Sequence, residues 1–383
     1  MTDLHEISLQ ESVIEDIDPL DTILGTDEIY QLGNKDADAI DALRLRFTRQ
    51  AVDHHRQHNP AYDRYCESLG FGSHRLSSAA DLATIPLLST GLFKRGDQAI
   101  RTGSGQDEVI LTTSSGTLGT VSVVPRDDVT LKRFFASVAI GKREVLGVET
   151  FDRQVFDLTP ATRDAPNVWV SYVMAGVGVL YTTRSYVRRD VLAMKEIVAD
   201  LAAVPENEGV NIVGPPPLLL DLAKYLEARG PLRLSPKSLI IAIGGWKRRE
   251  NEIIDRTVFD ERLAAAFGFP DTAPIRDSYN MVELNTVLFE CAFKAKHSPP
   301  WITVLARDPR TLAAMPSGQP GLLSFLDPTP LSYPGFILSD DFGTVVQRKQ
   351  CPCGITGDVV VFERRVNRIE SRGCALKLQT IGA

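Results

Sequence analysis

The sequence has no long apolar run, no basic leader and no dense cluster of basic residues. No stretch of about eighteen apolar residues is available to span a bilayer. Residues 1–20 lack a basic region followed by an apolar one, which is the pattern of a secretion signal. Nucleic acid requires a dense basic surface, and none is present. We therefore expect a cytoplasmic protein with no membrane span and no nucleic-acid partner, which binds a small molecule or another protein.

Acidic residues are instead gathered at the N-terminus. Residues 1–40 contain eleven acidic side chains and one basic side chain, Lys35, so they carry a charge of −10. Because the formal net charge of the whole chain is −7, the remaining residues carry +3. Residues 1–39 are therefore predicted to be an acidic arm. The whole chain has 383 residues, 43% of them hydrophobic and 24% charged, which is typical of a soluble globular protein with two domains, or with one large domain and a satellite.

Strand-like and helix-like segments alternate between residues 40 and 300. Strands are predicted at 108–112, 121–125, 155–158, 210–214 and 238–245, and helices at 40–58, 128–140, 190–203 and 215–230. This alternation predicts an α/β core over residues 40–300 with largely parallel sheets flanked by helices, in which ligands bind beyond the carboxyl ends of the strands. After residue 300, short strands divided by Gly, Pro and Asp turns predict a small β-rich lobe over 301–383.

The stretch LTTSSGTLGT, residues 111–120, follows a predicted strand and is rich in hydroxyl side chains and glycine. Such a turn offers backbone N–H groups and hydroxyls to phosphate oxygens, and glycine permits close approach. It is not a Walker loop, because the GxxxxGK[ST] pattern and its lysine are missing. Taken alone, the stretch fits a connection without a ligand equally well.

Two further motifs follow in order, YNMVE at 279–283 and DDFG at 340–343. With TSSGTLG at 113–119 they resemble the three nucleotide-binding motifs of the adenylate-forming ligases. FK at 93–94, GPPPLLLDLAKYL, IIAIGGWK and RGCALKL are together similar to the acyl-protein synthetases of bacterial luminescence, a branch related to the phenylacetate ligases. The resemblance runs from about residue 40 to the C-terminus and leaves the acidic arm unexplained.

The resemblance implies that ATP and a carboxylic acid form an acyl adenylate, and that the acyl group passes to a cysteine, a carrier protein or an amine. It implies that phosphate is held by the loop residues Ser114, Ser115, Gly116, Thr117 and Gly119, and that Glu283 holds Mg²⁺. Tyr279, with Gly244 and Gly245, would border the adenine, and Asp341 would accept hydrogen bonds from the ribose hydroxyls. Arg365 would pair with ribose or phosphate, and Arg364 is nearly as good a match for that role. Read singly, Glu283 and Arg365 could be solvated charges, Asp341 a turn residue and Tyr279 a core aromatic.

The sequence departs from the broad family at three positions. Asn280 and Val282 stand where glycine and threonine are usual, and Ser122 stands where many relatives have a loop lysine. The lost threonine hydroxyl removes a contact worth on the order of 1 kcal/mol. These departures keep open a catalytically weakened binding or scaffold protein. The apolar stretch 169–185, with Phe134 and Phe135, could line an acyl pocket or simply pack in the core, so fatty, aryl and small acids all remain open.

The C-terminus bears on the acyl acceptor. The chain stops nine residues after Cys374, so we expect no rotating C-terminal domain, and a CoA ligase that works by full domain rotation is disfavoured. An acyl-CoA ligase that lacks the usual C-terminal domain stays open as the alternative enzyme. The luminescence synthetases are similarly short and pass the acyl group to a cysteine near their own C-terminus. The match at RGCAL therefore implies that Cys374 is the acyl-accepting nucleophile, although a lone cysteine is more commonly a small buried residue.

Four other residues form a candidate zinc set. Cys351-Pro-Cys353-Gly has the form of a metal knuckle, and Cys291 lies six residues before His297. Three cysteines and one histidine are a closed structural zinc set. The halves are more than fifty residues apart and could meet only in the fold. Free thiols are the alternative, and a disulfide is least expected in a reducing cytoplasm.

Overall fold

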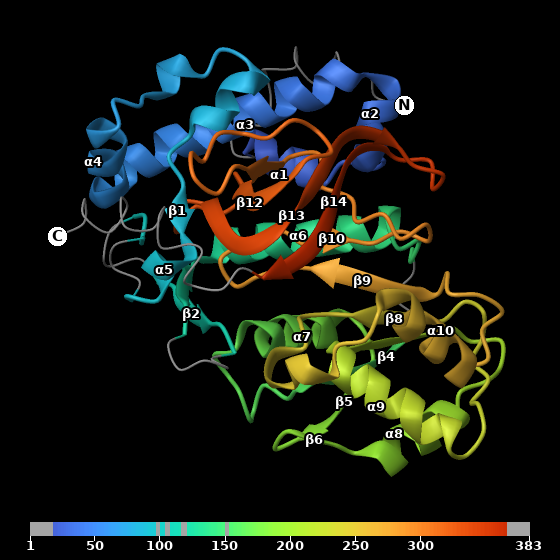
Figure 1. Ribbon diagram of the computed structural model, residues 1–383. Helices are drawn as coiled ribbons and strands as arrows, with labels where there is room; N and C mark the ends of the chain where they lie inside the picture. The colour runs from blue at the N-terminus through green and yellow to red at the C-terminus, as the bar shows by residue number, and fades with distance from the viewer. Residues whose placement is uncertain (1–17, 97–99, 104–107, 116–120, 150–152, 366–383) are drawn as a thin grey trace.

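The computed structural model describes residues 18–96, 100–103, 108–115, 121–149 and 153–365 (Figure 1). These residues form two large sheets and one small hairpin, with helices between and around them. The predicted α/β fold with largely parallel sheets is confirmed. Among the described residues, no helix is both long enough and apolar enough to cross a membrane.

The seven-stranded sheet supplies the parallel part of the fold. Its order is β10-β9-β8-β7-β4-β5-β6, with parallel pairing from β9 through β5 and an antiparallel strand at each edge. The strands are β4 (Gln154–Pro160), β5 (Thr183–Arg188), β6 (Val191–Leu192), β7 (Val210–Gly214), β8 (Leu239–Ala242), β9 (Ile275–Tyr279) and β10 (Leu288–Phe289). Because β8 and β9 run in the same direction, the residues that follow them lie at the same edge of the sheet.

The five-stranded sheet is mainly antiparallel and comes mostly from the C-terminal third of the chain. It contains β1 (Leu88–Ser89), β11 (Thr303–Arg307), β12 (Pro320–Leu326), β13 (Phe336–Gln350) and β14 (Thr356–Arg365). The short β1 pairs in parallel with β13. The β-rich part predicted over residues 301–383 therefore shares its sheet with a segment from the first quarter of the chain, since Leu88 pairs with Ile337. The small hairpin joins β2 (Ile110–Thr113) to β3 (Val123–Arg126).

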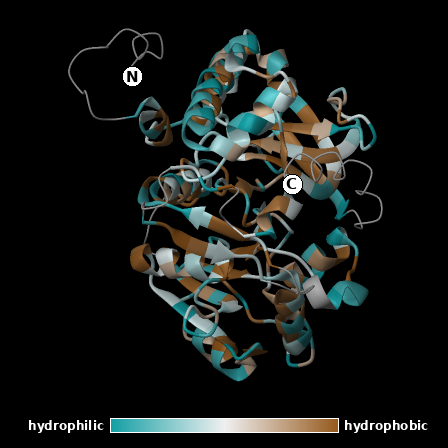
Figure 2. Ribbon diagram, turned by 90° about the vertical axis from the view of Figure 1, so that its left-hand side faces the viewer, coloured by the Kyte–Doolittle hydropathy of each residue, from teal (hydrophilic) through white to brown (hydrophobic). Residues whose placement is uncertain are grey.

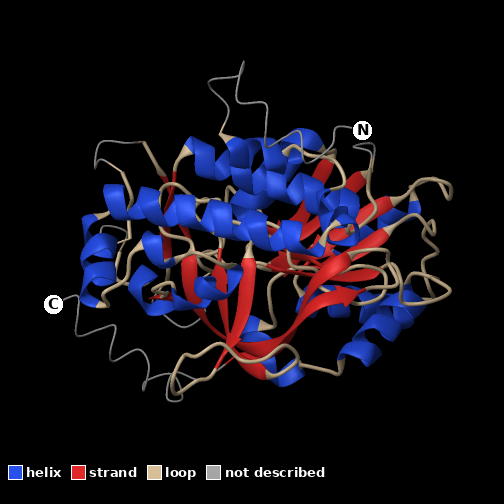
Figure 3. Cartoon of the chain, turned by 90° about the horizontal axis from the view of Figure 1, so that it is seen from above, coloured by secondary structure: helices blue, strands red, loops and turns tan. Residues whose placement is uncertain are grey.

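Helices separate and cover the sheets (Figures 1 and 3). The long α3 (Ala37–His58) and α4 (Pro60–Ser68) cover the outer side of the five-stranded sheet, and α6 (Asp128–Glu144) runs between the two large sheets. On the other side of the seven-stranded sheet lie α8 (Met194–Ala202), α9 (Pro216–Glu227) and α10 (Arg256–Ala266). The remaining helices are α1 (Pro19–Leu24), α2 (Leu32–Lys35), α5 (Thr90–Phe93) and α7 (Trp169–Leu180), with short 3₁₀ turns at Ile29–Gln31, Ser73–Arg75, Ala79–Thr84 and Lys247–Glu252.

Two hydrophobic cores hold these layers together. Side chains that alternate along each strand divide between the two faces of the seven-stranded sheet, so Ile241 belongs to the core that includes α6 residues, while Ile240 belongs to the core that includes α9 and α10 residues. Both sheets are mostly apolar along their strands (Figure 2). Helix starts follow the expected chemistry: the Asp127 carboxylate accepts from Thr130 N at 2.7 Å at the start of α6, and Pro60 opens α4 after the Asn59 cap.

The segment assigned to an acidic arm is folded from residue 18 onward. Leu20, Ile23 and Tyr30 are buried in the same core as α6. Its carboxylates meet basic groups of that helix, since Asp18 and Asp21 both pair with the buried Arg133, at 2.8 and 2.6 Å. The described part of the segment, residues 18–39, is thus packed on the body rather than extended from it. Residues 1–17 lie outside the described residues.

Candidate nucleotide site and metal cluster

The predicted nucleotide residues gather at the carboxyl edge of the seven-stranded sheet. Gly244 and Gly245 follow β8, and Tyr279 ends the neighbouring parallel strand β9. Gly244 has φ +69°, a conformation that favours glycine, so the chain can turn sharply away from the strand there. This edge is where ligands bind in open parallel sheets. The structure therefore brings the β8 glycines and the YNMVE segment to one place.

Tyr279, Asp341 and Arg365 form one cluster. The Tyr279 hydroxyl donates to the Asp341 carboxylate at 2.6 Å, and Arg365 Nε lies 3.3 Å from the other carboxylate oxygen. The Tyr279 ring stacks on Phe362, with ring centroids 3.8 Å apart. Burial, followed by the Asp341 charge, raises the pKa of Tyr279 well above its ordinary value, so the phenol stays protonated and donates. The cluster joins β9 to the β13–β14 hairpin.

The strand register distinguishes the two adjacent arginines. Arg365 stands opposite Asp341 in the β13–β14 ladder, whereas Arg364 stands opposite Phe342, with its guanidinium 5.1 Å from that ring centroid. Successive strand residues point to opposite faces. The geometry therefore places Arg365, and not Arg364, beside the predicted ribose carboxylate.

Glu283 is a buried carboxylate, with 6% of its surface exposed. Burial raises the pKa of Glu283, and this effect is opposed by a hydrogen bond from the Ser122 side chain and by the charges of Lys94 and Arg365. A carboxylate held in this way gains from a further cation, and carboxylate oxygen is a ligand that Mg²⁺ prefers. The residues present thus fit the magnesium role predicted for Glu283.

The loop predicted to grip phosphate is described only at its base. Ser114 Oγ accepts from Ser122 N at 3.0 Å, and Ser114 N donates to the Ser122 carbonyl at 3.1 Å, which closes the base of the β2–β3 hairpin. Ser115 is the last described residue before the tip, and Gly116, Thr117 and Gly119 lie outside the described residues. The phosphate role of this loop stays a prediction.

Two of the three departures from the family pattern have structural partners. The Asn280 amide accepts from Trp169 Nε1 at 2.7 Å and donates to the carbonyls of Leu284 and Thr286, so it anchors the YNMVE segment. Ser122, in the place of the loop lysine, bonds to Glu283. Val282 packs in the core at 5% exposure.

Sequence reasoning missed two basic residues that the fold brings to this site. Lys94 has no predicted role beyond its place in the FK pair, yet its charge acts on Glu283. Arg126 belongs to none of the motifs, and its guanidinium donates to the Val282 carbonyl at 2.5 Å. Both contacts join residues more than 150 positions apart, and no local pattern marks either residue.

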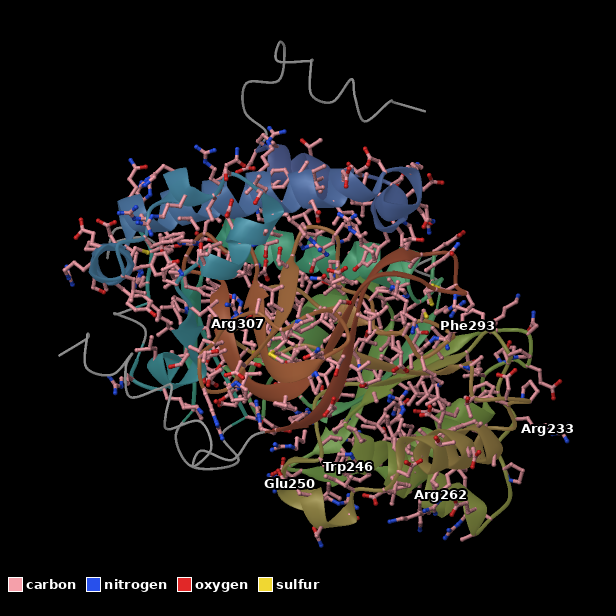
Figure 4. The ribbon with its side chains drawn as sticks, turned by 45° about the horizontal axis from the view of Figure 1, so that its top comes forward. Arg233, Trp246, Glu250, Arg262, Phe293 and Arg307 are labelled. Carbon is pink, nitrogen blue, oxygen red and sulfur yellow. The ribbon has the colours of Figure 1, made fainter. Side chains whose placement is uncertain are left out.

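The four predicted zinc ligands also meet. Their ligand atoms all lie within 4.8 Å of one another, with Cys291 Sγ 3.7 Å from Cys351 Sγ and Cys353 Sγ 3.3 Å from His297 Nε2. Cys351–Cys353 form the turn between β13 and β14, closed by Gly354 at φ +96°. Phe293, in the turn between the other two ligands, is 56% exposed at the edge of the molecule (Figure 4).

Two side chains of this cluster, His297 and Cys353, are uncharged without a cation. Burial lowers the pKa of His297 to about 4 and raises the pKa of Cys353 to about 12, so the imidazole is neutral and the thiol protonated. A neutral imidazole is the form that binds metal, and a cation would favour the thiolates. The donor set and its closeness fit a tetrahedral zinc ion.

Two other predictions have partial structural coverage. Cys374 lies outside the described residues. The stretch predicted to line an acyl pocket forms α7 and β5; its N-terminal part is packed, with Trp169 4.5 Å from Phe134 between ring centroids, but Val179 is 84% exposed. The acyl-pocket role of this stretch stays a prediction.

Comparisons with known proteins bear on the whole chain. The model of the family described as "Acyl-protein synthetase, LuxE" matches residues 10–381. The chain belongs to this family. It is accordingly an ATP-dependent ligase that forms an acyl adenylate and transfers the acyl group, as the sequence predicted.

Relatives and a solved structure agree with this assignment. The chain is 33% identical to the long-chain-fatty-acid–luciferin-component ligase of Vibrio harveyi, over 88% of this chain and 87% of that protein. It is 32% identical to the protein of the same name from Aliivibrio fischeri, over 88% of each. It shares its fold with a 2-hydroxyisobutyryl-CoA ligase solved with 2-HIB-AMP and CoA, at a TM-score of 0.68 and 17% identity, covering 87% of this chain and 69% of that one.

Proposed function

We propose that this acyl-protein synthetase activates a long-chain fatty acid and passes the acyl group to a protein. The acid and the class of acceptor are suggested by the names of the two relatives, long-chain-fatty-acid–luciferin-component ligase. The observation that carries the proposal within this chain is the cluster of Tyr279, Asp341 and Arg365 beside the buried Glu283, at the carboxyl edge of a parallel sheet.

In this proposal each residue acts on a different part of ATP. Tyr279 lies against the adenine, Asp341 accepts from the ribose hydroxyls, and Arg365 steadies Asp341 and the α-phosphate. The hairpin loop from Ser114 onward holds the β- and γ-phosphates. Glu283 holds Mg²⁺, which when bound offsets the phosphate charge.

The two half-reactions balance as follows. A carboxylate oxygen of the acid attacks the α-phosphorus of ATP, and pyrophosphate leaves. A thiolate then attacks the acyl carbonyl carbon, and AMP leaves with the bonding electron pair. We propose Cys374 as that thiolate, on the strength of the RGCAL match alone.

Radiolabelled pyrophosphate exchange into ATP tests the first step. Exchange should require a carboxylic acid and should rise with chain length across a panel of fatty acids, with an aryl acid as comparison. Glu283→Gln should lower exchange at least a hundredfold, while Glu290→Gln, which alters another buried carboxylate that bonds to Arg256, should retain it. If short and aryl acids support exchange better than fatty acids, the proposed substrate is wrong.

Intact mass spectrometry after turnover tests the acceptor. An acyl adduct should form on the wild-type chain and be absent from Cys374→Ser, whereas Cys66→Ser should still be labelled because Cys66 is fully buried. An adduct that persists in Cys374→Ser would exclude this thiol.

We further propose that Cys291, His297, Cys351 and Cys353 bind a structural zinc ion, which the closeness of their ligand atoms supports. The ion would tie the tip of the β13–β14 hairpin, which carries Asp341 and Arg365, to the segment after β10. Freshly purified protein should hold about one equivalent of zinc, as a closed set of four ligands predicts. Cobalt substitution should give the charge-transfer band of thiolate ligands.

Cys353→Ser is expected to lose the metal and lower the thermal midpoint. Cys66→Ser is the control, because it changes a buried thiol that stands outside the cluster. Wild-type protein free of zinc, with no cobalt–thiolate band after reconstitution, would show that the cysteines are free thiols.

A further inference from the structure

An arginine is completely buried at the base of the predicted phosphate loop. Arg126 is the last residue of β3, and its side chain is 0% exposed. A buried charge is costly unless hydrogen bonds or a counter-charge compensate it. Among the described residues no carboxylate contacts this guanidinium directly, and the charges of Glu283 and Asp327 reach it only from farther away. If this position served packing alone, a neutral side chain would serve there without that cost.

The guanidinium donates hydrogen bonds to two separate segments, β2 and residues 282–285. One terminal nitrogen bonds to the Thr112 hydroxyl in β2, the strand that leads into the loop. The other donates to the Val282 carbonyl at 2.5 Å, next to Glu283. Nε donates to the Asn285 amide oxygen at 3.4 Å. The planar fork therefore links the loop strand to the backbone that carries the predicted magnesium ligand.

An aromatic platform fixes the plane of the fork. The guanidinium carbon lies 3.7 Å from the Trp169 ring centroid, a close cation–π contact in a desolvated place. Trp169 in turn donates to Asn280, in the same segment as Glu283. One buried cation thus touches the loop strand, the start of α7 and the YNMVE segment. A lysine ammonium could not reproduce this two-ended planar geometry.

We propose that Arg126 is a positioning residue for adenylation, which holds the Glu283 segment in register with the strand that leads into the phosphate loop. The inference rests on the proposed function. Because Arg126 contacts none of Tyr279, Asp341 or Arg365, its loss should disturb the half of the site that holds phosphate and Mg²⁺ and spare the half that holds the nucleoside.

Two ligands separate these halves. MgATP uses both, whereas an acyl-sulfamoyl adenosine, which mimics the acyl adenylate and has no β- or γ-phosphate, uses mainly the nucleoside half. We expect Arg126→Met to weaken MgATP binding by at least tenfold in calorimetry, and to change the affinity for the sulfamoyl analogue by less than about threefold. In pyrophosphate exchange, kcat should fall and KM for MgATP should rise together.

Arg126→Lys and Arg133→Met complete the set. Lysine keeps the charge without the fork, so it should recover only a small part of the exchange activity. Arg133 is equally buried, but it holds Asp18 and Asp21 of the N-terminal segment, so Arg133→Met should lower the unfolding midpoint without separating the two ligands.

Equal weakening of both ligands in Arg126→Met, or losses that match those of Arg133→Met, would overturn the inference. The inference would also be overturned if Arg126→Met bound MgATP as tightly as wild type and the wild-type chain exchanged pyrophosphate. A wild-type chain that shows no acid-dependent exchange would instead overturn the proposed function, and the two failures are therefore distinguishable.

Discussion

Asp341 and its neighbour Asp340 offer a matched test of the ribose contact. Adjacent residues on β13 point to opposite faces, so Asp341 meets Tyr279 and Arg365 while Asp340 accepts from the Thr90 hydroxyl at 2.8 Å. If Asp341 accepts hydrogen bonds from two ribose hydroxyls, Asp341→Ala removes two bonds to a charged group, each worth about 1.5 kcal/mol at least. The expected loss is about 3 kcal/mol, or about two orders of magnitude in MgATP affinity.

Asp341→Ala should lower the free energy of unfolding of the unliganded protein by less than it lowers the free energy of MgATP binding. Arg365 is 68% exposed on its side chain, so water replaces Asp341 as its partner and the lost ion pair contributes little. The Tyr279 hydroxyl loses one acceptor, which is worth about 1 kcal/mol. Affinity should therefore fall by more than stability, and the two should not fall in parallel.

Calorimetry with MgATP and urea unfolding measure the two quantities on each variant. Asp340→Ala should lose about 1 kcal/mol of stability through Thr90 and keep its MgATP affinity. The ribose role of Asp341 would be refuted if both variants bound MgATP equally, or if Asp341→Ala lost stability while its affinity stayed within about threefold of wild type.

Two further predictions concern buried carboxyl groups, and both follow from a pKa raised by burial. Below the pKa that it has in the unfolded chain, such a group makes its full contribution to the free energy of unfolding. As pH rises through the higher pKa that it has in the folded protein, that contribution is lost. For Asp157, whose pKa is raised to about 6, the loss falls between about pH 4 and pH 6 and amounts to about 2 to 3 kcal/mol. Urea unfolding should show Asp157→Asn to be more stable than wild type at pH 7.5 but not at pH 4, and an unchanged pH profile would contradict this. For Glu283, Glu283→Gln in magnesium-free buffer should likewise raise the thermal midpoint at pH 7.5, with a gap that closes toward acid pH, while exchange falls at least a hundredfold. A lower midpoint for Glu283→Gln would mean that the carboxylate stabilises the fold.

Local patterns predicted the regular elements well where neighbouring residues decide the conformation. The strand predicted at 210–214 is β7 as observed, and the proline-started helix after it is α9. The helix predicted at 190–203 begins four residues late, because Arg189 and Asp190 adopt positive φ and turn the chain into the short β6 first. Such a turn of non-glycine residues has no clear sequence signal.

The β-rich part shows where the sequence misleads. The stretch SDDFG has the composition of a turn, yet it lies inside the fifteen-residue strand β13. Gly343 permits this, since a Cβ at that position would lie 2.2 Å from the Val361 carbonyl oxygen of the paired strand. The register also shifts beside this glycine, which lets both Asp341 and Arg365 face Tyr279. Glycine within a strand marks a close backbone approach as readily as it marks a turn.

The sequence predicted only those residues of the candidate site that belong to recognisable motifs. Tyr279, Glu283 and Asp341 belong to motifs in the expected order, whereas their mutual contacts depend on the pairing of strands distant in the sequence. The departures from the family pattern could be interpreted only after folding. Asn280 looks like a loss of glycine, but its amide bonds to Trp169 and to two backbone carbonyls. Ser122 looks like a loss of lysine, but it bonds to the buried carboxylate.

The missing loop lysine therefore does not by itself indicate a weakened enzyme. Positive charge near Glu283 comes from other segments. The charges of Lys94 and Arg365 act on the Glu283 carboxylate, and the buried Arg126 donates to the carbonyl of the preceding residue, Val282. These cations belong to three separate parts of the chain, so their effect depends on tertiary packing rather than on one loop. A scaffold protein would have no reason to bury Arg126 and Glu283 at the same sheet edge, since each is costly to bury and neither neutralises the other by direct contact. The cost is explained if the two groups serve a ligand that carries both phosphate and Mg²⁺.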